Sequence, residues 1–333
     1  MKHLVLLLIV ALLAACASKT TGPECGGFTN QAELIADRVE SISPDRLMGR
    51  VADFASIHSR YMHYDEGCAE ALNMLAGWLE EQGNVAEWDS FTHFRLREIR
   101  TASLYVDFPG SVTPERQVLV GAHWDSSVGN DHWWYDEFGI AHHDSSPRCP
   151  GAVDNATGVA ALLELTRILR DTPTAYSVRV VFFAGEELGF WGSNRFMEFW
   201  DEETGPDSLV CMVNVDMVGW DGEGEADLRL LCHESTVPMA VDLLPLTAKL
   251  IRPVLLDTFQ IEELADSPGS DHYPFWRKDL PAIFLWEGPE DSYPNANSTL
   301  DTLGAVMPGI LEAGARALTA TVLQLAKAQL PES

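Results

Sequence analysis

The amino-acid sequence predicts an α/β fold: a three-layer α/β/α sandwich with a mixed, mostly parallel central sheet. Continuous apolar runs, typical of strands covered on both faces, alternate along the chain with segments of helical periodicity. Hydrophobic residues make up 46% of the 333 residues. The sequence shows no internal repeat and no interior linker rich in Pro, Gly and Ser. We therefore expect one folded domain of about 300 residues, a size that large α/β sheets reach.

The individual elements follow from these patterns. Gln117–Ala122 is an apolar run typical of a buried strand. Leu72, Leu75 and Leu79 recur at helical spacing, and Gly83 is a natural end for that helix. Helices are predicted over residues 31–42, 65–82, 156–170 and 304–330, and strands over residues 101–108, 117–122, 177–184, 208–218, 227–232 and 281–286.

The N-terminus predicts export and lipid anchoring. Lys2 precedes the apolar run Leu4–Leu13, which at about ten residues is too short for a transmembrane helix of about 20 residues. The run ends in Leu13-Ala14-Ala15-Cys16, which resembles the lipobox of bacterial lipoproteins. The alternative is an ordinary signal peptide with a chance cysteine.

The lipobox sets the predicted organisation of the chain. We expect a lipoprotein signal peptide at residues 1–15, a lipidated tether at residues 16–29 and a folded domain at residues 30–333. Ala17, where inner-membrane lipoproteins carry an aspartate, resembles the outer-membrane sorting signal. The predicted location is the cell envelope, at the outer membrane and facing the periplasm or the exterior.

Charge and cysteine content limit the partners. The chain has 22 Lys and Arg residues against 50 Asp and Glu residues, a formal net charge of -28. Such a surface repels phosphate backbones, so nucleic acid is not an expected partner. The acidity serves solubility or life in a salty medium, or it favours substrates with a free amine. Of six cysteines, five remain after Cys16, so at least one thiol stays unpaired in an oxidising compartment, and Cys25 with Cys68 is a candidate bridge.

Polar side chains follow three of the predicted strands at the point where each strand ends. His123-Trp124-Asp125 follows one strand, Gly185-Glu186-Glu187 follows the next, and Asp216 lies at the end of the third. Ligand sites in open α/β sheets lie at the carboxyl ends of strands. Three polar clusters at three strand ends therefore predict one shared site.

Two of the candidate ligands have alternative interpretations. His123 and Asp125 have the spacing of a metal-binding imidazole and the carboxylate that orients it, since residues i and i+2 of a strand point the same way. The alternative is a core histidine satisfied by a nearby acid. Asp154, in the small-residue turn Gly151–Gly158, offers two oxygens that can bridge two cations. The alternative there is a helix N-cap made by Asp or Asn.

The strongest signal is Phe182–Gly189, in which Glu186 and Glu187 directly follow an apolar strand. Because an unpaired buried charge is costly, one glutamate is expected to ligate a metal and the other to act as general base on water. The alternative is the acidic first turn of a helix. Asp216, inside a buried strand, is disfavoured unless it is paired or metal-bound. A mixed N/O ligand set without thiolate suits catalytic zinc.

The order of these motifs resembles the co-catalytic zinc aminopeptidases, metallopeptidase family M28, which include bacterial leucyl aminopeptidase, aminopeptidase Y and glutamate carboxypeptidase. The resemblance covers roughly residue 72 to the C-terminus. It implies the zinc exopeptidase fold, and it makes residues 30–333 a zinc peptidase domain. It implies that His123 and Asp216 hold one zinc, that Asp154 bridges, and that Glu187 holds the other. Glu186 as general base and Asp125 are the predicted catalytic residues.

The last motif of the family differs in this sequence. The family has His-Thr-x-x-Asp-Thr, whose histidine completes the second zinc site, whereas this chain reads Asn297-Ser298-Thr299-Leu300-Asp301-Thr302. Asn297 therefore stands at the ligand position. An amide oxygen is a poor zinc ligand beside imidazole, so we expect two zinc sites of which the second is weak.

The segment Ser126–Pro150 is longer than the family pattern predicts. We expect it to roof the cleft, or to supply a histidine in place of the missing ligand from His132, His142 and His143. The alternative is a surface loop stabilised by its own aromatic residues. Tyr273 and Tyr293 are the candidates for a tyrosine that stabilises an oxyanion.

Together these observations predict a zinc-dependent exopeptidase, an aminopeptidase that hydrolyses peptide bonds. The expected partners are peptide substrates and, through lipid on Cys16, a membrane. One alternative is a glutaminyl-cyclase-like transferase on the same fold. Another is a catalytically silent peptide-binding lipoprotein, suggested by Asn297. Retention of Glu186 argues against a silent binder, which needs no general base.

Overall fold

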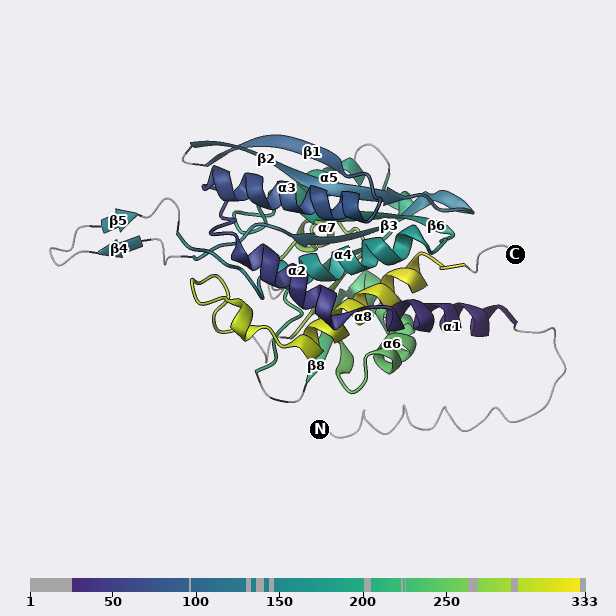
Figure 1. Cartoon of the computed structure of the whole chain (residues 1–333). Helices are drawn as coiled ribbons and strands as arrows, with labels where there is room; N and C mark the ends of the chain where they lie inside the picture. The colour runs from purple at the N-terminus through teal and green to yellow at the C-terminus, as the bar shows by residue number, and fades with distance from the viewer. Residues whose placement is uncertain are drawn as a thin grey trace, which may run out of the picture.

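Figure 1 shows the chain as a computed structural model. The structure describes residues 26–95, 97–129, 133–135, 141–143, 147–200, 205–222, 224, 226–262, 269–288 and 293–329. The predicted signal peptide and residues 16–25 of the predicted tether lie outside the described residues. Residues 26–29, the end of that tether, belong to helix α1 (Gly26–Glu40). No helix within the described ranges is long and apolar enough to cross a membrane.

An eight-stranded sheet forms the centre of the molecule, in the order β1-β2-β6-β3-β7-β10-β8-β9. The pairs β3–β6, β3–β7, β7–β10 and β8–β9 are parallel, and the pairs β1–β2, β2–β6 and β8–β10 are antiparallel. The predicted mixed, mostly parallel sheet is confirmed. The strands are β1 (Glu87–Arg95), β2 (Arg97–Phe108), β3 (Thr113–His123), β6 (Tyr176–Phe183), β7 (Leu209–Val215), β8 (Asp227–His233), β9 (Leu255–Ile261) and β10 (Ala282–Trp286).

Helices cover both faces of this sheet. Figure 1 shows α3, α4 and α8 in front of the sheet, with α5 and α7 behind it. Helices α1 and α2 pack outside α4 and α8, and α6 packs on β8 and β9. The remaining helices are α2 (Pro44–Ser56), α3 (Asp65–Glu81), α4 (Ala156–Arg170), α5 (Trp191–Glu198), α6 (Val237–Leu250), α7 (Tyr273–Trp276) and α8 (Pro308–Leu325), with short 3-10 turns η3 (Pro206–Ser208), η4 (Glu234–Thr236) and η6 (Leu303–Ala305).

Two apolar clusters fill the space between the layers. The larger one lies on the α4 and α8 side, where α4 is buried from Ala156 to Leu165 and Leu162 is fully buried. The smaller one lies on the α5 and α7 side and contains Phe183, Trp200 and Trp276. Burial on both faces explains why β7 and β10 consist almost entirely of apolar residues, whereas β6 is continuously apolar only over its second half, Val180–Phe183.

The sheet brings three strand ends together. In the parallel register His123 of β3 lies opposite Phe183 of β6, and Gly121 of β3 lies opposite Asn214 of β7. Gly121 must be glycine, because a Cβ there would lie 2.1 Å from the Phe183 ring. The loops that leave β3, β6 and β7 therefore start side by side at one edge of the sheet, as the sequence predicts.

Some predicted bounds were wrong. The helix predicted over residues 304–330 divides into η6 and α8, because Pro308 starts a new helix and Lys327, at a positive φ of 55°, follows its end. The strand predicted over residues 208–218 is shorter, as β7 covers only Leu209–Val215.

Helices α2 and α6 were not predicted, and Pro245 inside α6 interrupts its sequence pattern.

Strands β1 and β9 also escaped prediction, since both are edge strands. Most of their side chains are half-buried or exposed, including Trp88, Phe94, Leu255 and Phe259. An edge strand buries little surface, so its sequence shows neither a long apolar run nor a clean alternation.

The described cysteines are all free and buried: Cys68, Cys149, Cys211 and Cys232. Cys68 Sγ lies 3.3 Å from the Tyr61 carbonyl oxygen. Cys25, its candidate partner, lies outside the described residues. Burial raises the pKa of all four thiols, to about 12 for Cys149 and about 11 for Cys232.

Leu162→Ala should lower the free energy of unfolding by about 2–5 kcal/mol, because it leaves a cavity under the helix that follows Asp154. The matched control is Leu255→Ala on β9, where the leucine is 58% exposed and the expected change is within about 0.5 kcal/mol. Urea unfolding of both variants measures the difference. Equal stabilities would show that the α4 side is not the core.

Candidate active site

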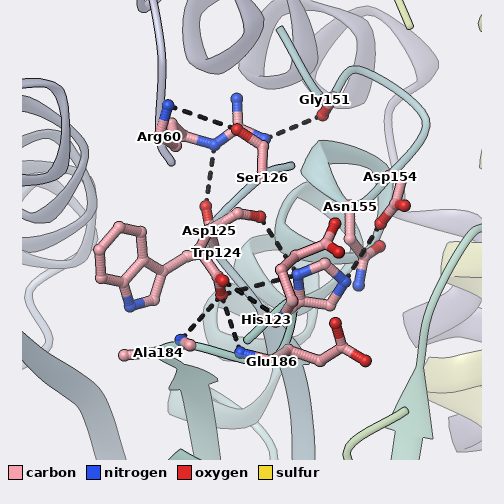
Figure 2. Close-up of polar contacts among 12 residues, drawn as sticks. Arg60, His123, Trp124, Asp125, Ser126, Gly151, Asp154, Asn155, Ala184 and Glu186 are labelled. Atoms are coloured by element: carbon pink, nitrogen blue, oxygen red, sulfur yellow. Dashed lines mark hydrogen bonds and ion pairs between the residues drawn. The ribbon is translucent and has the colours of Figure 1, made fainter. Parts of the chain in front are cut away.

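His123 and two carboxylates meet at the shared edge of β3 and β7. His123 is buried at the end of β3, and its Nε2 lies 3.2 Å from Asp154 Oδ1 and 3.3 Å from Asp216 Oδ1. Asp216 directly follows β7, and Asp154 lies in the turn before α4. Figure 2 shows the imidazole between the Asp154 turn and the segment that carries Glu186.

These residues fit a divalent metal ion. One ligand atom each from His123, Asp154 and Glu187 lies within 4.8 Å of the others. Glu187 Oε1 is buried and has no hydrogen-bond partner among the described residues. An imidazole with carboxylates and no thiolate is the chemistry of a catalytic zinc site. The donor set and the partnerless oxygen together favour a cation at this position.

The charges in the site lead to the same conclusion. Burial, with repulsion from neighbouring carboxylates, raises the pKa of Glu186 and Glu187 well above the ordinary value. Burial disfavours a charged ring, yet Asp216 and Glu186 hold the pKa of His123 well above its usual value. The pKa of Asp216 lies below its usual value, because His123 and Ser270 outweigh the effect of burial. Without a metal, protons must offset this negative charge, and a divalent cation would offset it directly.

Asp125 differs from the expectation. His123 Nδ1 lies 3.2 Å from the Asp125 backbone oxygen and 3.8 Å from its carboxylate. That carboxylate instead accepts the backbone N–H groups of Gly185, Glu186 and Glu187, at 2.9, 3.2 and 3.3 Å. The i, i+2 rule does not hold here because β3 ends at His123. Asp125 therefore fixes the turn that carries the glutamates, while its backbone orients the imidazole.

The helix cap and the metal-facing carboxylate are neighbouring residues. Asn155 is the N-cap of α4, and its Oδ1 accepts the N–H of Gly158 at 2.9 Å. Its Nδ2 donates to the Val215 carbonyl at 3.0 Å, which ties the start of α4 to the end of β7. Asp154 is thereby free of the capping role that the sequence left open, and its side chain faces His123.

A second buried carboxylate supports the Asp154 turn. Asp301 accepts the backbone N–H groups of Val153 and Asp154 at 2.8 and 2.9 Å. Asn297, four residues earlier, is exposed, and its Nδ2 donates to Asp154 Oδ2 at 3.3 Å. The residue at the position of the family histidine thus lies beside the predicted bridging carboxylate.

A cleft of about 320 Å³ opens over these groups. Its carboxylates come from Asp154, Glu186, Glu187 and Asp216, and its other lining residues are Gly189, Phe190, Met217, Gly269, Ala296 and Asn297. No Lys or Arg is among these lining residues. The cleft therefore combines four carboxylates with a few apolar side chains.

The described part of Ser126–Pro150 contributes no residue to the cleft lining. Its strands β4 (Trp133–Tyr135) and β5 (Ala141–His143) form a two-stranded sheet that projects from the layers in Figure 1. Gly129 lies against Asn297, since a Cβ on Gly129 would be 3.4 Å from the Asn297 carbonyl oxygen. His132 lies outside the described residues. The predicted roof over the cleft, and a histidine ligand from this segment, stay predictions.

Ser270 supports the site through a contact that the sequence did not reveal. Its Oγ donates to Asp216 Oδ2 at 2.6 Å and accepts from Asn214 Nδ2 at 2.8 Å. The polar stretch Gly269–Phe275 suggests no role for Ser270 from the sequence alone. Only the proximity of residues 214 and 270 in the fold reveals this contact.

Neither candidate tyrosine is among the described residues that line the cleft. Tyr273 packs against Phe190, with ring centroids 6.2 Å apart. Tyr293 is buried against Trp220, at 5.5 Å between centroids. An oxyanion role for either stays a prediction.

Residues 103–322, about two thirds of the chain, match the family described as peptidase family M28. The chain belongs to peptidase family M28. Aminopeptidase YwaD of Bacillus subtilis is 29% identical over 190 residues, which are 56% of this chain and 40% of that protein. A probable zinc metalloprotease of Pyrenophora tritici-repentis is 26% identical over 240 residues, which are 66% of this chain and 52% of that protein. The chain thus spans about half the length of these curated relatives.

Solved structures share the fold of this M28 chain. The LapA aminopeptidase of Legionella pneumophila has a TM-score of 0.68 at 20% identity, covering 93% of this chain and 78% of that one. A glutaminyl cyclase of Bacteroides thetaiotaomicron has a TM-score of 0.65 at 18% identity, covering 84% and 97%. At these identities the likeness shows the fold alone and does not separate a peptidase from a cyclase.

Asp301→Ala should lower the free energy of unfolding of the metal-free protein by about 2 kcal/mol or more, because two buried N–H groups lose their acceptor. Asp301→Asn keeps one acceptor oxygen and should lose less. Asp53→Ala, at an exposed site on α2, is the control. Denaturant unfolding after chelation of metal measures all three. Wild-type stability in Asp301→Ala would contradict the supporting role of this carboxylate.

Proposed function

We propose that this M28 chain is a zinc-dependent aminopeptidase. The observation that carries the proposal is the place of Glu186: it is buried in the cleft wall beside the ligand-type atoms of His123, Asp154 and Glu187. The family match and the aminopeptidase and zinc metalloprotease names of its relatives support the same activity.

Zinc is the cofactor of the proposed reaction. His123, Asp154 and Asp216 would hold one ion, and Asp154 with Glu187 would hold a second beside Asn297. When bound, zinc polarises the scissile carbonyl and lowers the pKa of water.

Glu186 would move the proton of the reaction. The backbone N–H of Glu186 donates to Asp125 Oδ1 at 3.2 Å, so the protein itself positions the backbone of Glu186. A carboxylate Oε of Glu186 accepts a proton from the attacking water and passes it to the nitrogen of the leaving amine. Burial raises the pKa of this carboxyl well above its ordinary value.

The charge of the cleft favours an aminopeptidase over a carboxypeptidase. Its described lining has four carboxylates and no Lys or Arg. Bound zinc would offset part of this negative charge, but the described lining offers no cationic side chain to pair with a substrate carboxylate, whereas a carboxylate of the cleft can pair with a free amino group.

We also propose, from the lipobox alone, that lipid on Cys16 tethers the enzyme to the cell envelope, at the outer membrane. Peptides reaching the periplasm or the exterior would then be its substrates.

With zinc supplied, the protein should hydrolyse a leucyl anilide with a free amine and leave the N-acetylated anilide intact, because the acidic cleft recognises the amine.

Glu186→Gln should cut kcat at least about 10²-fold while zinc content stays the same. Glu80→Gln, at an exposed position on α3, is the matched control. Equal turnover by Glu186→Gln would exclude the base role. Pyroglutamate formation from a glutaminyl peptide without anilide hydrolysis would identify a cyclase instead.

Wild-type protein should retain one zinc after dialysis, and its activity should rise when zinc is added. Changing even an outer contact of a zinc ligand costs about 10–100-fold in metal affinity, so an amide in place of an imidazole should cost at least that much. Asn297→His should retain two zincs, and Asn295→His is the nearby control. Elemental analysis gives the stoichiometry. Two tightly held zincs in the wild type would refute the weak second site and direct attention to His132, His142 and His143.

Cys16→Ala should move the protein from the membrane fraction to the soluble fraction, or block its maturation, because the acylated residue is lost. Cys25→Ala is the control and should stay with the membranes. Fractionation after a salt wash and immunoblotting measure the outcome. Membrane retention of Cys16→Ala would place the anchor elsewhere.

A further inference from the structure

Arg60 is a fully buried arginine in the segment between α2 and α3, and Figure 2 shows it beside Gly151 and Ser126. Its guanidinium donates to backbone carbonyl groups of separate segments. Nε donates to Trp124 at 2.8 Å, Nη2 to Gly151 at 2.9 Å, and Nη1 to Pro150 at 2.5 Å and Phe54 at 3.2 Å. One side chain thereby joins three parts of the chain.

Two of these parts carry residues of the candidate zinc site. Trp124 lies between His123 and Asp125, and Gly151 begins the turn that ends at Asp154. The approach is close, because a Cβ on Gly151 would lie 2.6 Å from Arg60 Nη2. The backbone adds to the connection: Arg60 N–H donates to Ser126 Oγ, and Ser126 N–H donates to the Arg60 carbonyl, both at 3.3 Å.

Burying the charged guanidinium of Arg60 costs free energy, which argues against a purely structural role. The guanidinium forms no ion pair with a carboxylate of the described residues, although it is completely buried. Burial lowers its pKa, and Cys149 followed by Asp301, Asp125 and Asp154 act in the opposite direction. Burying a cation without a paired anion is costly, and the donated hydrogen bonds to four backbone carbonyls offset part of that cost.

We propose that Arg60 is a positioning residue that fixes the distance between His123 and Asp154 across the zinc site, which rests on the proposed function. It does so by holding the carbonyl of Trp124 and the carbonyl of Gly151 on one planar group. The imidazole and the carboxylate then stand ready for the ion.

Arginine suits this task better than lysine. A guanidinium presents donors in a rigid fork and contacts several acceptors in fixed directions, whereas an ammonium is a single point charge on a flexible stem. Lysine at position 60 would keep the charge and lose the span between Trp124 and Gly151. The pair of substitutions Arg60→Met and Arg60→Lys therefore separates geometry from charge.

Zinc affinity of the full chain, measured by competition with a chromophoric chelator well below the unfolding temperature, tests the proposal. Arg60→Met should bind zinc about 10–100-fold more weakly, the usual effect of losing a contact that orients a ligand. The zinc affinity of Arg60→Lys should also fall, to a value within about threefold of that of Arg60→Met. Arg46→Met is the matched control: Arg46 pairs with Glu164 on α4 at 2.7 Å, away from the site, and should keep wild-type affinity even where stability falls.

Kinetics at saturating zinc supply a second readout. If Arg60 sets the geometry of the site, kcat should fall in Arg60→Met while KM changes little. A protein that is only less stable loses active molecules, which the zinc-binding stoichiometry reveals. If Arg60→Met does not fold, Ser126→Ala replaces it, because this variant loosens the backbone of Arg60 and keeps the guanidinium. Ser126→Ala should show a smaller loss of zinc affinity.

Three results would overturn the positioning role: wild-type zinc affinity in a folded Arg60→Met, full recovery of affinity in Arg60→Lys, or unchanged affinity in Ser126→Ala when Arg60→Met does not fold. The second would assign the effect to charge alone. Failure of the proposed function is distinct, because the wild type would then bind zinc without hydrolysing the leucyl anilide, while the zinc affinities of the Arg60 variants would still test the positioning role.

Discussion

Repulsion among carboxylates is the constraint on which the rest of this structure depends. Asp154, Glu186, Glu187 and Asp216 surround one imidazole in a single cleft. Like charges at such distances repel strongly wherever water is scarce. To keep these four carboxylates together, the protein must hold them in place against this repulsion and must offset their negative charge. Backbone contacts hold the carboxylates in place, and a metal ion would offset the charge.

Each acidic segment is held by a group from a distant part of the chain. Asp125 accepts the N–H groups of the Glu186 turn, Asp301 accepts those of the Asp154 turn, and Ser270 donates to Asp216. These contacts leave the remaining carboxylate oxygens directed at the cleft. These contacts fix the backbone of the acidic turns, so binding of an ion would need little rearrangement of the chain.

The sequence predicted the parts of the fold that rest on local periodicity. The central strands and α4 are buried on most sides, so their side chains form long apolar patterns. The rule for strand ends then placed His123, Glu186 and Asp216 together. Edge strands β1 and β9 bury too little surface to leave such a pattern. The roles of Ser270 and Arg60 depend on contacts between residues more than fifty positions apart, which no local pattern encodes.

The buried thiols have a practical consequence. A thiolate, not a thiol, is the reactive species, and the four described cysteines combine burial with raised pKa values. Alkylating reagents would therefore react with these thiols only when local or global unfolding exposes them to solvent. The four sit on different elements: α3, the chain beside Ser59, β7 and β8. Their separate modification rates would record, element by element, how often each part of the domain opens to solvent.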